Sequence, residues 1–262
     1  MLLLALDTST SYASIALARD GHLLAELTWE VGQRHSAELF DRIAQLLDGA
    51  HLAPNMLNGI AVALGPGSFN GTRVAVTAAK TLAFALGVPL YGHSTLDVIA
   101  WPYASGSLTI WSLLDAGRGQ VYAARYWPPF YSRRQGATLA SWAAEAPAIM
   151  TPQELVDHIA ATWELPVLIA GEWRLETHET LEKAESITAS FASEGMVRRA
   201  SSLAQLAFAR AEVGDADDPL TLEPLYLRKP NITQSAKVAL PPYIEPATPP
   251  AGGEDTAHAL HR

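Results

Sequence analysis

The stretch ALGPGSFNGTRVAVTAAK, residues 63–80, decides the fold because it joins a buried strand to a long helix. Residues 59–64 form an apolar run typical of a strand, residues 71–86 favour a helix, and a glycine-rich turn lies between them. Such a turn can bind an anion, because free backbone N–H groups and the positive end of the helix dipole point the same way. The same glycines can also be needed for the geometry of the turn alone. Both hypotheses stay open at this point.

The segments before and after this stretch predict a mixed sheet with helices on its faces. Short apolar or alternating runs separated by turn residues predict an antiparallel meander, and helical spacing of apolar residues predicts an amphipathic helix with Ser36 as a candidate N-cap. The expected elements are strands at 2–6, 12–19, 23–28, 59–64 and 89–91, and helices at 36–48, 71–86 and 94–100, the last with a capping box from Ser94 to Asp97.

A second pass through the chain finds an internal echo of its first hairpin. LLALDTSTSYASIALAR (3–19) and WSLLDAGRGQVYAARYW (111–127) share one plan, an apolar strand ending in Asp, a polar turn and an alternating strand. Asp7 and Asp115 occupy matching places. The spacing suits a duplicated domain, and chance similarity of two hairpins is the alternative. The second half adds a helix that opens at Thr151–Glu154, a strand at 167–170 and a helix at 201–213.

Composition excludes several classes of function. The 262 residues are 49% hydrophobic and carry 18 basic against 27 acidic side chains, a net charge of −9, so tight nucleic-acid binding by this chain alone is not expected. There is no cysteine, which excludes disulfides, thiolate catalysis and cysteine-ligated metals. The close pair His258 and His261 lacks a credible metal-binding pattern. The apolar start reads as a core strand and no run reaches membrane-spanning length, so a cytoplasmic protein that does not contact membranes is expected.

Several motifs together resemble the bacterial TsaB (YeaZ) family. They are MLLLALDTSTSYASIALA (1–18), RHSAELF (34–40), GPGSFNGTRVAV (65–76), AKTLAFALGVPLYGHSTLDVIA (79–100), LLDAGRGQVYAA (113–124) and PLYLR (224–228). The resemblance covers most of residues 1–125 and returns at 224–228. It implies an α/β protein with two RNase H-like domains of the actin-like, Hsp70-like, sugar-kinase-like ATPase fold. The implied organisation is a first domain at 1–104, a second, reduced domain at 105–235 whose last helix packs back on the first, and a flexible Pro-rich tail at 236–262.

The resemblance also implies a function. Members of this family are non-catalytic dimerisation subunits in the synthesis of N6-threonylcarbamoyladenosine (t6A) at position 37 of tRNA. The expected partners are a TsaD-like catalytic subunit, a TsaE-like ATPase recruited through the complex, and a second copy of the chain when the protein is alone; tRNA is reached only indirectly. No catalytic residue, metal or cofactor is expected, and weak nucleotide binding is left open.

Residues that could serve an anion or a nucleotide lie in two groups. The glycine-rich turn offers backbone amides and a counter-charge, and the two strand-ending aspartates could hold a metal ion through water or could instead cap their own turns. These candidates are Asp7, Gly65, Gly67, Ser68, Gly71, Arg73 and Asp115. The segment AGEWRLE (170–176) argues against ATP binding between the domains, because fold relatives carry a second glycine-rich turn here, whereas this chain has Glu172 and Trp173.

The helix at 71–86 is apolar on almost every side, which predicts that other helices cover it. Its small residues would let a helix of another chain approach closely. We expect helices 36–47 and 71–86 to form a four-helix bundle with the partner, through Leu39, Phe40, Ile43, Leu47, Val74, Ala75, Ala78, Ala79, Leu82 and Leu86. Burial of the helix wholly within this chain is the alternative.

Two enzymatic hypotheses compete with the scaffold hypothesis. A small-molecule kinase of the same fold would use Asp7 at a metal and residues 65–71 at a phosphate. A metallopeptidase would need metal ligands and a general base. His35 could be a catalytic base, but no nucleophile or orienting group lies near it in the sequence, and a position at a helix entry beside Ser36 is the alternative. The Pro-rich and aromatic insertion at 127–147 has no functional interpretation.

Overall fold

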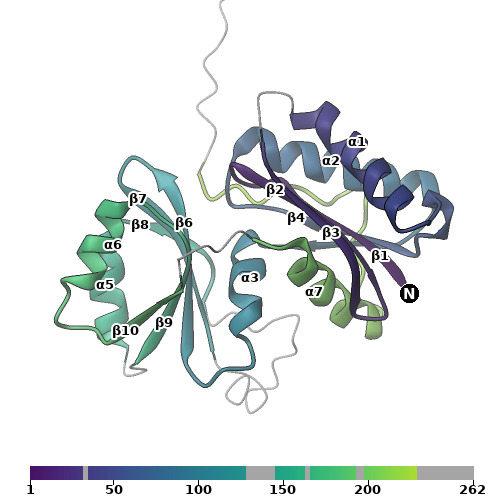
Figure 1. Ribbon diagram of the computed structural model, residues 1–262. Coiled ribbons are helices and arrows are strands. Elements are labelled where there is room, and N and C mark those ends of the chain that lie inside the picture. The colour runs from purple at the N-terminus through teal and green to yellow at the C-terminus, as the bar shows by residue number, and fades with distance from the viewer. Residues whose placement is uncertain (32–34, 128–144, 163–165, 193–197, 229–262) are drawn as a thin grey trace, which may run out of the picture. The chain divides into compact units, whose positions relative to one another are not determined.

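The computed structural model describes residues 1–31, 35–127, 145–162, 166–192 and 198–228. Its first sheet has five strands in the order β3-β2-β1-β4-β5 (Figure 1). Only β2 runs antiparallel to the others. The strands are β1 (Leu2–Asp7), β2 (Tyr12–Arg19), β3 (His22–Glu30), β4 (Gly59–Ala63) and β5 (Leu90–His93).

The second sheet repeats this topology in the order β10-β9-β6-β7-β8. Here β7 alone is antiparallel, so β6 corresponds to β1 and β9 to β4. The strands are β6 (Thr109–Gly117), β7 (Gln120–Tyr126), β8 (Ala148–Met150), β9 (Val167–Glu172) and β10 (Ala189–Ala192). The α/β fold class and the internal duplication expected from the echo of the hairpin are both confirmed. Strands β8 and β10 were not predicted from the sequence, because they are short and partly exposed and so carry little hydrophobic pattern.

Both faces of the first sheet are covered by helices. Leu2, Leu4 and Leu6 of β1 join the core under α1 (His35–Gly49) and α2 (Phe69–Leu86). The intervening Leu3 and Ala5 pack on the opposite face with α7 (Ala200–Glu212) (Figure 1). Because successive side chains of a strand alternate between faces, an unbroken apolar strand needs both layers.

The second sheet is covered in the same way. On one face it packs against α3 (Thr95–Ala100), and on the other against α5 (Pro152–Ala161) and α6 (Leu175–Glu182) (Figure 1). The capping boxes predicted for Ser94–Asp97 and Thr151–Glu154 are both present. Short 3-10 turns follow α1, at Pro54–Met56, and α3, at Trp101–Tyr103.

The segment after α7 returns along the first sheet, which explains the PLYLR motif. The Leu225 N–H donates to the Leu64 carbonyl (2.7 Å), and Tyr226 lies against Phe69 with ring centroids 5.2 Å apart. Arg228 then donates to the carbonyl of Ala116 (2.8 Å) in the second sheet. Residues 1–230 form one compact unit.

The structure leaves some sequence-based expectations untested. The domain boundaries at 104 and 235 stay predictions, although α7 does pack on β1 and β2. The tail at 236–262, with His258 and His261, and most of the insertion at 127–147 lie outside the described residues, as does the side chain of His35. Within the described ranges, no helix is both long and apolar enough to cross a bilayer.

Candidate functional site

The glycine-rich turn packs directly on the turn between β1 and β2. A Cβ atom on Gly67 would lie 2.0 Å from the Ser9 carbonyl oxygen, and one on Gly71 would lie 2.0 Å from that of Thr8. The Ser68 N–H donates to the Ser9 carbonyl (2.6 Å), and the Thr8 hydroxyl donates to the Gly71 carbonyl (2.6 Å). These glycines therefore permit a close approach between two backbone segments, and protein atoms occupy the space next to them.

One free N–H group in the first turn of α2 is satisfied by the helix's own N-cap residue. Ser68 is the N-cap, and its hydroxyl accepts from the Gly71 N–H (3.2 Å). Arg73, expected as a counter-charge for phosphate, instead places its guanidinium carbon 5.2 Å from the centre of the Phe69 ring. Gly65 has a φ of 94° and lies against the Leu225 carbonyl, so the backbone conformation at this position requires glycine. The arrangement fits a turn that positions a helix.

Asp7 ends β1, is completely buried and has donors on both carboxylate oxygens. One oxygen accepts from the N–H (2.9 Å) and the hydroxyl of Ser9, the pattern of an Asx turn. The other accepts from Nε of Arg198 (3.1 Å). Asp7 thus caps its turn, as one of the two hypotheses predicted, and forms a buried ion pair as well.

Asp115 makes similar contacts near the end of β6. Its Oδ1 accepts from the Gly117 N–H (2.9 Å), and its Oδ2 accepts from Nε of Arg174 (2.8 Å). Both aspartates therefore accept a hydrogen bond from the backbone N–H two residues ahead and pair with an arginine. The duplication extends from topology to these side-chain contacts.

Arg198, which was not predicted from the sequence, contacts the most partners around Asp7. Its side chain is buried, and its Nη1 donates to the Thr10 hydroxyl (2.7 Å) and to the Glu172 carboxylate (2.6 Å), while Nη2 donates to the Tyr12 carbonyl (3.1 Å). We call Asp7, Thr10, Tyr12, Glu172 and Arg198 the Arg198 cluster. No sequence motif marks Arg198, because its partners are 26 to 191 residues away.

Residues of the segment AGEWRLE contact other parts of the chain. Gly171 packs against the Leu113 carbonyl, and Glu172 at the end of β9 turns to Arg198. Trp173 lies against His178 and Phe191, with ring centroids about 6.5 Å and 6.4 Å away. Carboxylate and indole thus both have structural partners.

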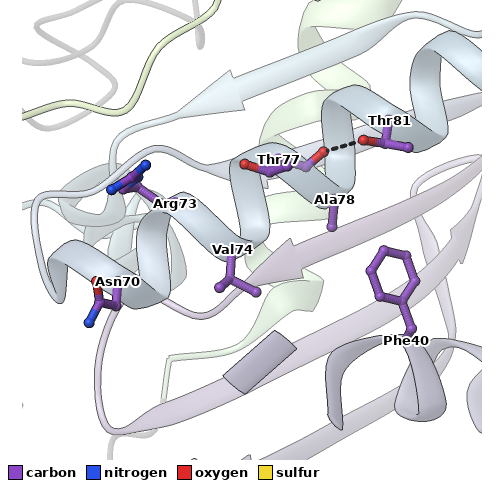
Figure 2. A pocket seen from close by; sticks show the side chains of 7 residues that line it. All are labelled: Phe40, Asn70, Arg73, Val74, Thr77, Ala78 and Thr81. Atoms are coloured by element: carbon purple, nitrogen blue, oxygen red, sulfur yellow. Dashed lines mark hydrogen bonds between the residues drawn. The ribbon is translucent and has the colours of Figure 1, made fainter. Parts of the chain in front are cut away.

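A largely apolar groove of about 480 Å³ lies between α1 and α2. Figure 2 shows its lining: Phe40 from α1 faces Val74 and Ala78 of α2, and Asn70, Arg73, Thr77 and Thr81 complete the α2 side. Phe40 is 48% exposed although it is a large aromatic residue. The groove could accept an apolar side chain or a helix of another protein.

The residues predicted for the interface differ in their burial within the chain. Six of its ten residues are buried in the chain's own core, and of these Ala78 also lines the groove: Leu39, Ile43, Leu47, Ala75, Ala78 and Ala79. Phe40, Val74, Leu82 and Leu86 keep accessible surface, and α2 also exposes Phe84 (79%). Helix α2 is thus covered by its own chain on one side only, so part of its apolar surface stays available.

One further cluster of titratable groups is structural. The Tyr126 hydroxyl donates to Asp97 (2.8 Å), whose other oxygen accepts from the Ser94 N–H (3.1 Å). Burial raises the pKa of Asp97 to about 6 and lowers the pKa of the neighbouring His93 to about 4. These groups close a capping box beneath α3. Within the described part of the chain, no group of three or more His, Asp or Glu residues could hold a metal ion.

Comparison with known proteins gives sequence matches to about half of the chain. A model of the family described as tRNA N6-adenosine threonylcarbamoyltransferase (TsaD) matches residues 29–161, just over half of the chain. The protein TsaB of Bacillus subtilis, named for tRNA threonylcarbamoyladenosine biosynthesis, is 39% identical over 126 residues, which are 48% of this chain and 55% of the relative. TsaB of Escherichia coli is 33% identical over 130 residues, with the same shares. The chain thus spans about half the length of the curated relatives it matches.

A solved structure extends the likeness beyond that half. YeaZ from Pseudomonas aeruginosa superposes with a TM-score of 0.70 at 27% identity, over 86% of this chain and 99% of that one. The expected family is therefore confirmed by sequence and by fold. The chain belongs to the TsaB/YeaZ proteins, within the TsaD-related family that its residues 29–161 match.

Proposed function

We propose that this protein is a non-catalytic subunit of the machinery that makes t6A at position 37 of tRNA. It binds a TsaD-like catalytic subunit through the groove between α1 and α2, and helps that complex to recruit a TsaE-like ATPase. Alone, it pairs with a second copy of itself. It works in the cytoplasm, reaches tRNA only through the complex and needs no cofactor.

The groove is the observation that carries this proposal. It combines an exposed aromatic residue, Phe40, with small or polar residues on α2, so that a helix could approach closely. Family membership supplies the identity of the partner, because a homologous subunit would present a related pair of helices. Burying an aromatic residue of this exposure would contribute about 1–3 kcal/mol to association.

The surroundings of Asp7 support a non-catalytic role over the kinase alternative. Both oxygens of its carboxylate already accept hydrogen bonds from protein donors, and the glycines of the 65–71 turn face the carbonyls of Thr8 and Ser9. A phosphate placed against those carbonyl oxygens would be repelled. The chain's own atoms thus fill the positions that a kinase would give to metal and phosphate.

The test is size-exclusion chromatography with light scattering, on the chain alone and mixed with the TsaD-like protein of the same organism. Phe40→Asp and Thr77→Arg each place a charge or bulk in the groove at an exposed position, so both variants should fold and fail to bind. Leu175→Asp is the matched control, because Leu175 is also exposed (68%) but lies on α6.

The expected result is a one-to-one complex for the wild type and the control, and none for the two groove variants. A complex of undiminished affinity with both groove variants would reject the groove as the interface. Phosphoryl transfer by the purified chain, abolished by Asp7→Ala in a protein that still folds, would replace the scaffold hypothesis with the kinase alternative.

A further inference from the structure

The Arg198 cluster joins the two sheets by their strand ends. Asp7 is the last residue of β1 in the first sheet, and Glu172 is the last residue of β9 in the second sheet. A single guanidinium contacts both carboxylates, at 3.1 Å and 2.6 Å, and donates as well to Thr10 and Tyr12 in the turn after β1. Four acceptors from the two halves of the molecule therefore meet on one planar cation.

This geometry suits a rigid link better than an incidental surface pair. The Arg198 side chain is 3% exposed and that of Asp7 is 0% exposed, so solvent screens their interaction little. Glu172, which makes the contact to the second sheet, is 28% exposed, so solvent screens that contact more. The guanidinium is planar, and its donors have fixed directions, so hydrogen bonds to both sheets are satisfied together only in one relative orientation. Movement of β9 away from β1 would leave a buried charge without its second carboxylate.

We propose that Arg198 is a built-in cation that fixes the relative orientation of the two sheets, in place of a bound ligand. The proposal does not depend on the proposed function, because it concerns only contacts within residues 1–228. Its consequence is that the two halves keep one arrangement without nucleotide or metal, and that a partner bound to the first sheet meets a second sheet already in place.

Removing Arg198 itself is a poor test, because Asp7 would be left buried and unpaired and the protein could fail to fold. Glu172→Ala is sharper. It removes only the contact to the second sheet and leaves Arg198 paired with Asp7, Thr10 and Tyr12. Glu182→Ala is the matched control, because Glu182 is exposed at the end of α6. Other contacts between the halves, such as that of Arg228 with Ala116, remain in both variants.

The readout is the distance between two spin labels, measured by double electron–electron resonance. The chain contains no cysteine, so Ala160→Cys on α5 and Glu212→Cys on α7 introduce the only two labelling sites, both exposed and in helices that cover different sheets. Excess unlabelled protein removes distances between copies. Thermal unfolding of each labelled variant verifies that it is folded.

We expect a single narrow distance distribution for the wild type and for Glu182→Ala, and a broadened one for Glu172→Ala. Glu172→Gln should lie between them, because the amide oxygen can still accept a hydrogen bond from Arg198 without its charge. A distribution for Glu172→Ala as narrow as that of the wild type would overturn the proposal. So would equal broadening in Glu182→Ala.

Discussion

Replacing Gly71 by alanine tests whether the glycine-rich turn exists for packing. The added Cβ would lie 2.0 Å from the Thr8 carbonyl oxygen and 3.3 Å from the Ser68 Cβ. Cβ atoms essentially never lie closer than 3.0 Å to such atoms, so the two backbones must separate by about 1 Å. That shift breaks or weakens the hydrogen bonds from Thr8 to Gly71 and from Ser68 to Ser9.

The expected cost follows from these contacts. Two hydrogen bonds contribute about 1 kcal/mol each, and the forced expansion adds about 1–3 kcal/mol. Alanine in a helix gains back up to about 1 kcal/mol over glycine. Gly71→Ala should therefore lower the free energy of unfolding by about 2–4 kcal/mol and the Tm by roughly 10 °C for a unit of this size.

Urea unfolding without any ligand is the assay, with Gly49→Ala as the control. Gly49 is also glycine in a helix, and nothing lies within 4 Å of the position that an added Cβ atom would take there, so its replacement should be neutral or slightly stabilising. If the turn existed to hold a phosphate, the space beside Gly71 would be open in the free protein and alanine would be tolerated. A Gly71→Ala protein within about 1 kcal/mol of the wild type would refute the packing argument.

Two further predictions concern buried charges. Burial raises the pKa of Asp97 from 3.8 to about 6, so this group lowers the free energy of unfolding as the pH rises from about 4 to 6. Burial lowers the pKa of His93 from 6.5 to about 4, so this group raises the free energy of unfolding over almost the same pH range. Each effect amounts to about 3 kcal/mol, so the stability of the wild type should change little with pH. Urea unfolding of Asp97→Asn should show a free energy of unfolding that rises by up to about 3 kcal/mol between pH 4 and 6.5. A profile for Asp97→Asn as flat as that of the wild type would contradict the opposing pKa shifts. The Arg210 side chain on α7 donates hydrogen bonds to Asp215, Asp217 and the Gly92 carbonyl. Arg210→Met should lower the free energy of unfolding by about 3 kcal/mol. A thermal unfolding curve unchanged from that of the wild type would show that these ion pairs contribute nothing to stability.

Local patterns predicted the long elements well because each carries its own signal. The apolar run of β1, the helical spacing of α1 and α2, and the capping boxes at Ser94 and Thr151 are visible in consecutive residues. The repeated hairpin predicted the duplicated sheet. The short strands β8 and β10 were missed because three or four partly exposed residues show no reliable alternation.

The candidate site was predicted less completely, because its contacts are formed between distant parts of the chain. The sequence identified Asp7 and the glycines as candidate site residues but did not identify their partners. The carbonyls of Thr8 and Ser9 contact the glycines, and Arg198, which is 191 residues away in the chain, pairs with Asp7. The sequence also did not indicate that Ala75 and Ala79 of α2 are fully buried in the chain's own core. A hydrophobic pattern predicts which face of an element is buried but not which neighbour buries it.

By itself the sequence determined the class of fold, its duplication and its family, because hydrophobic period, caps and motifs are encoded within short windows. Only the tertiary structure decided what the glycine-rich turn does, which face of α2 stays exposed and which cation links β1 to β9. Those properties depend on which atoms approach within about 3 Å, and that approach is set by the packing of segments far apart in the chain.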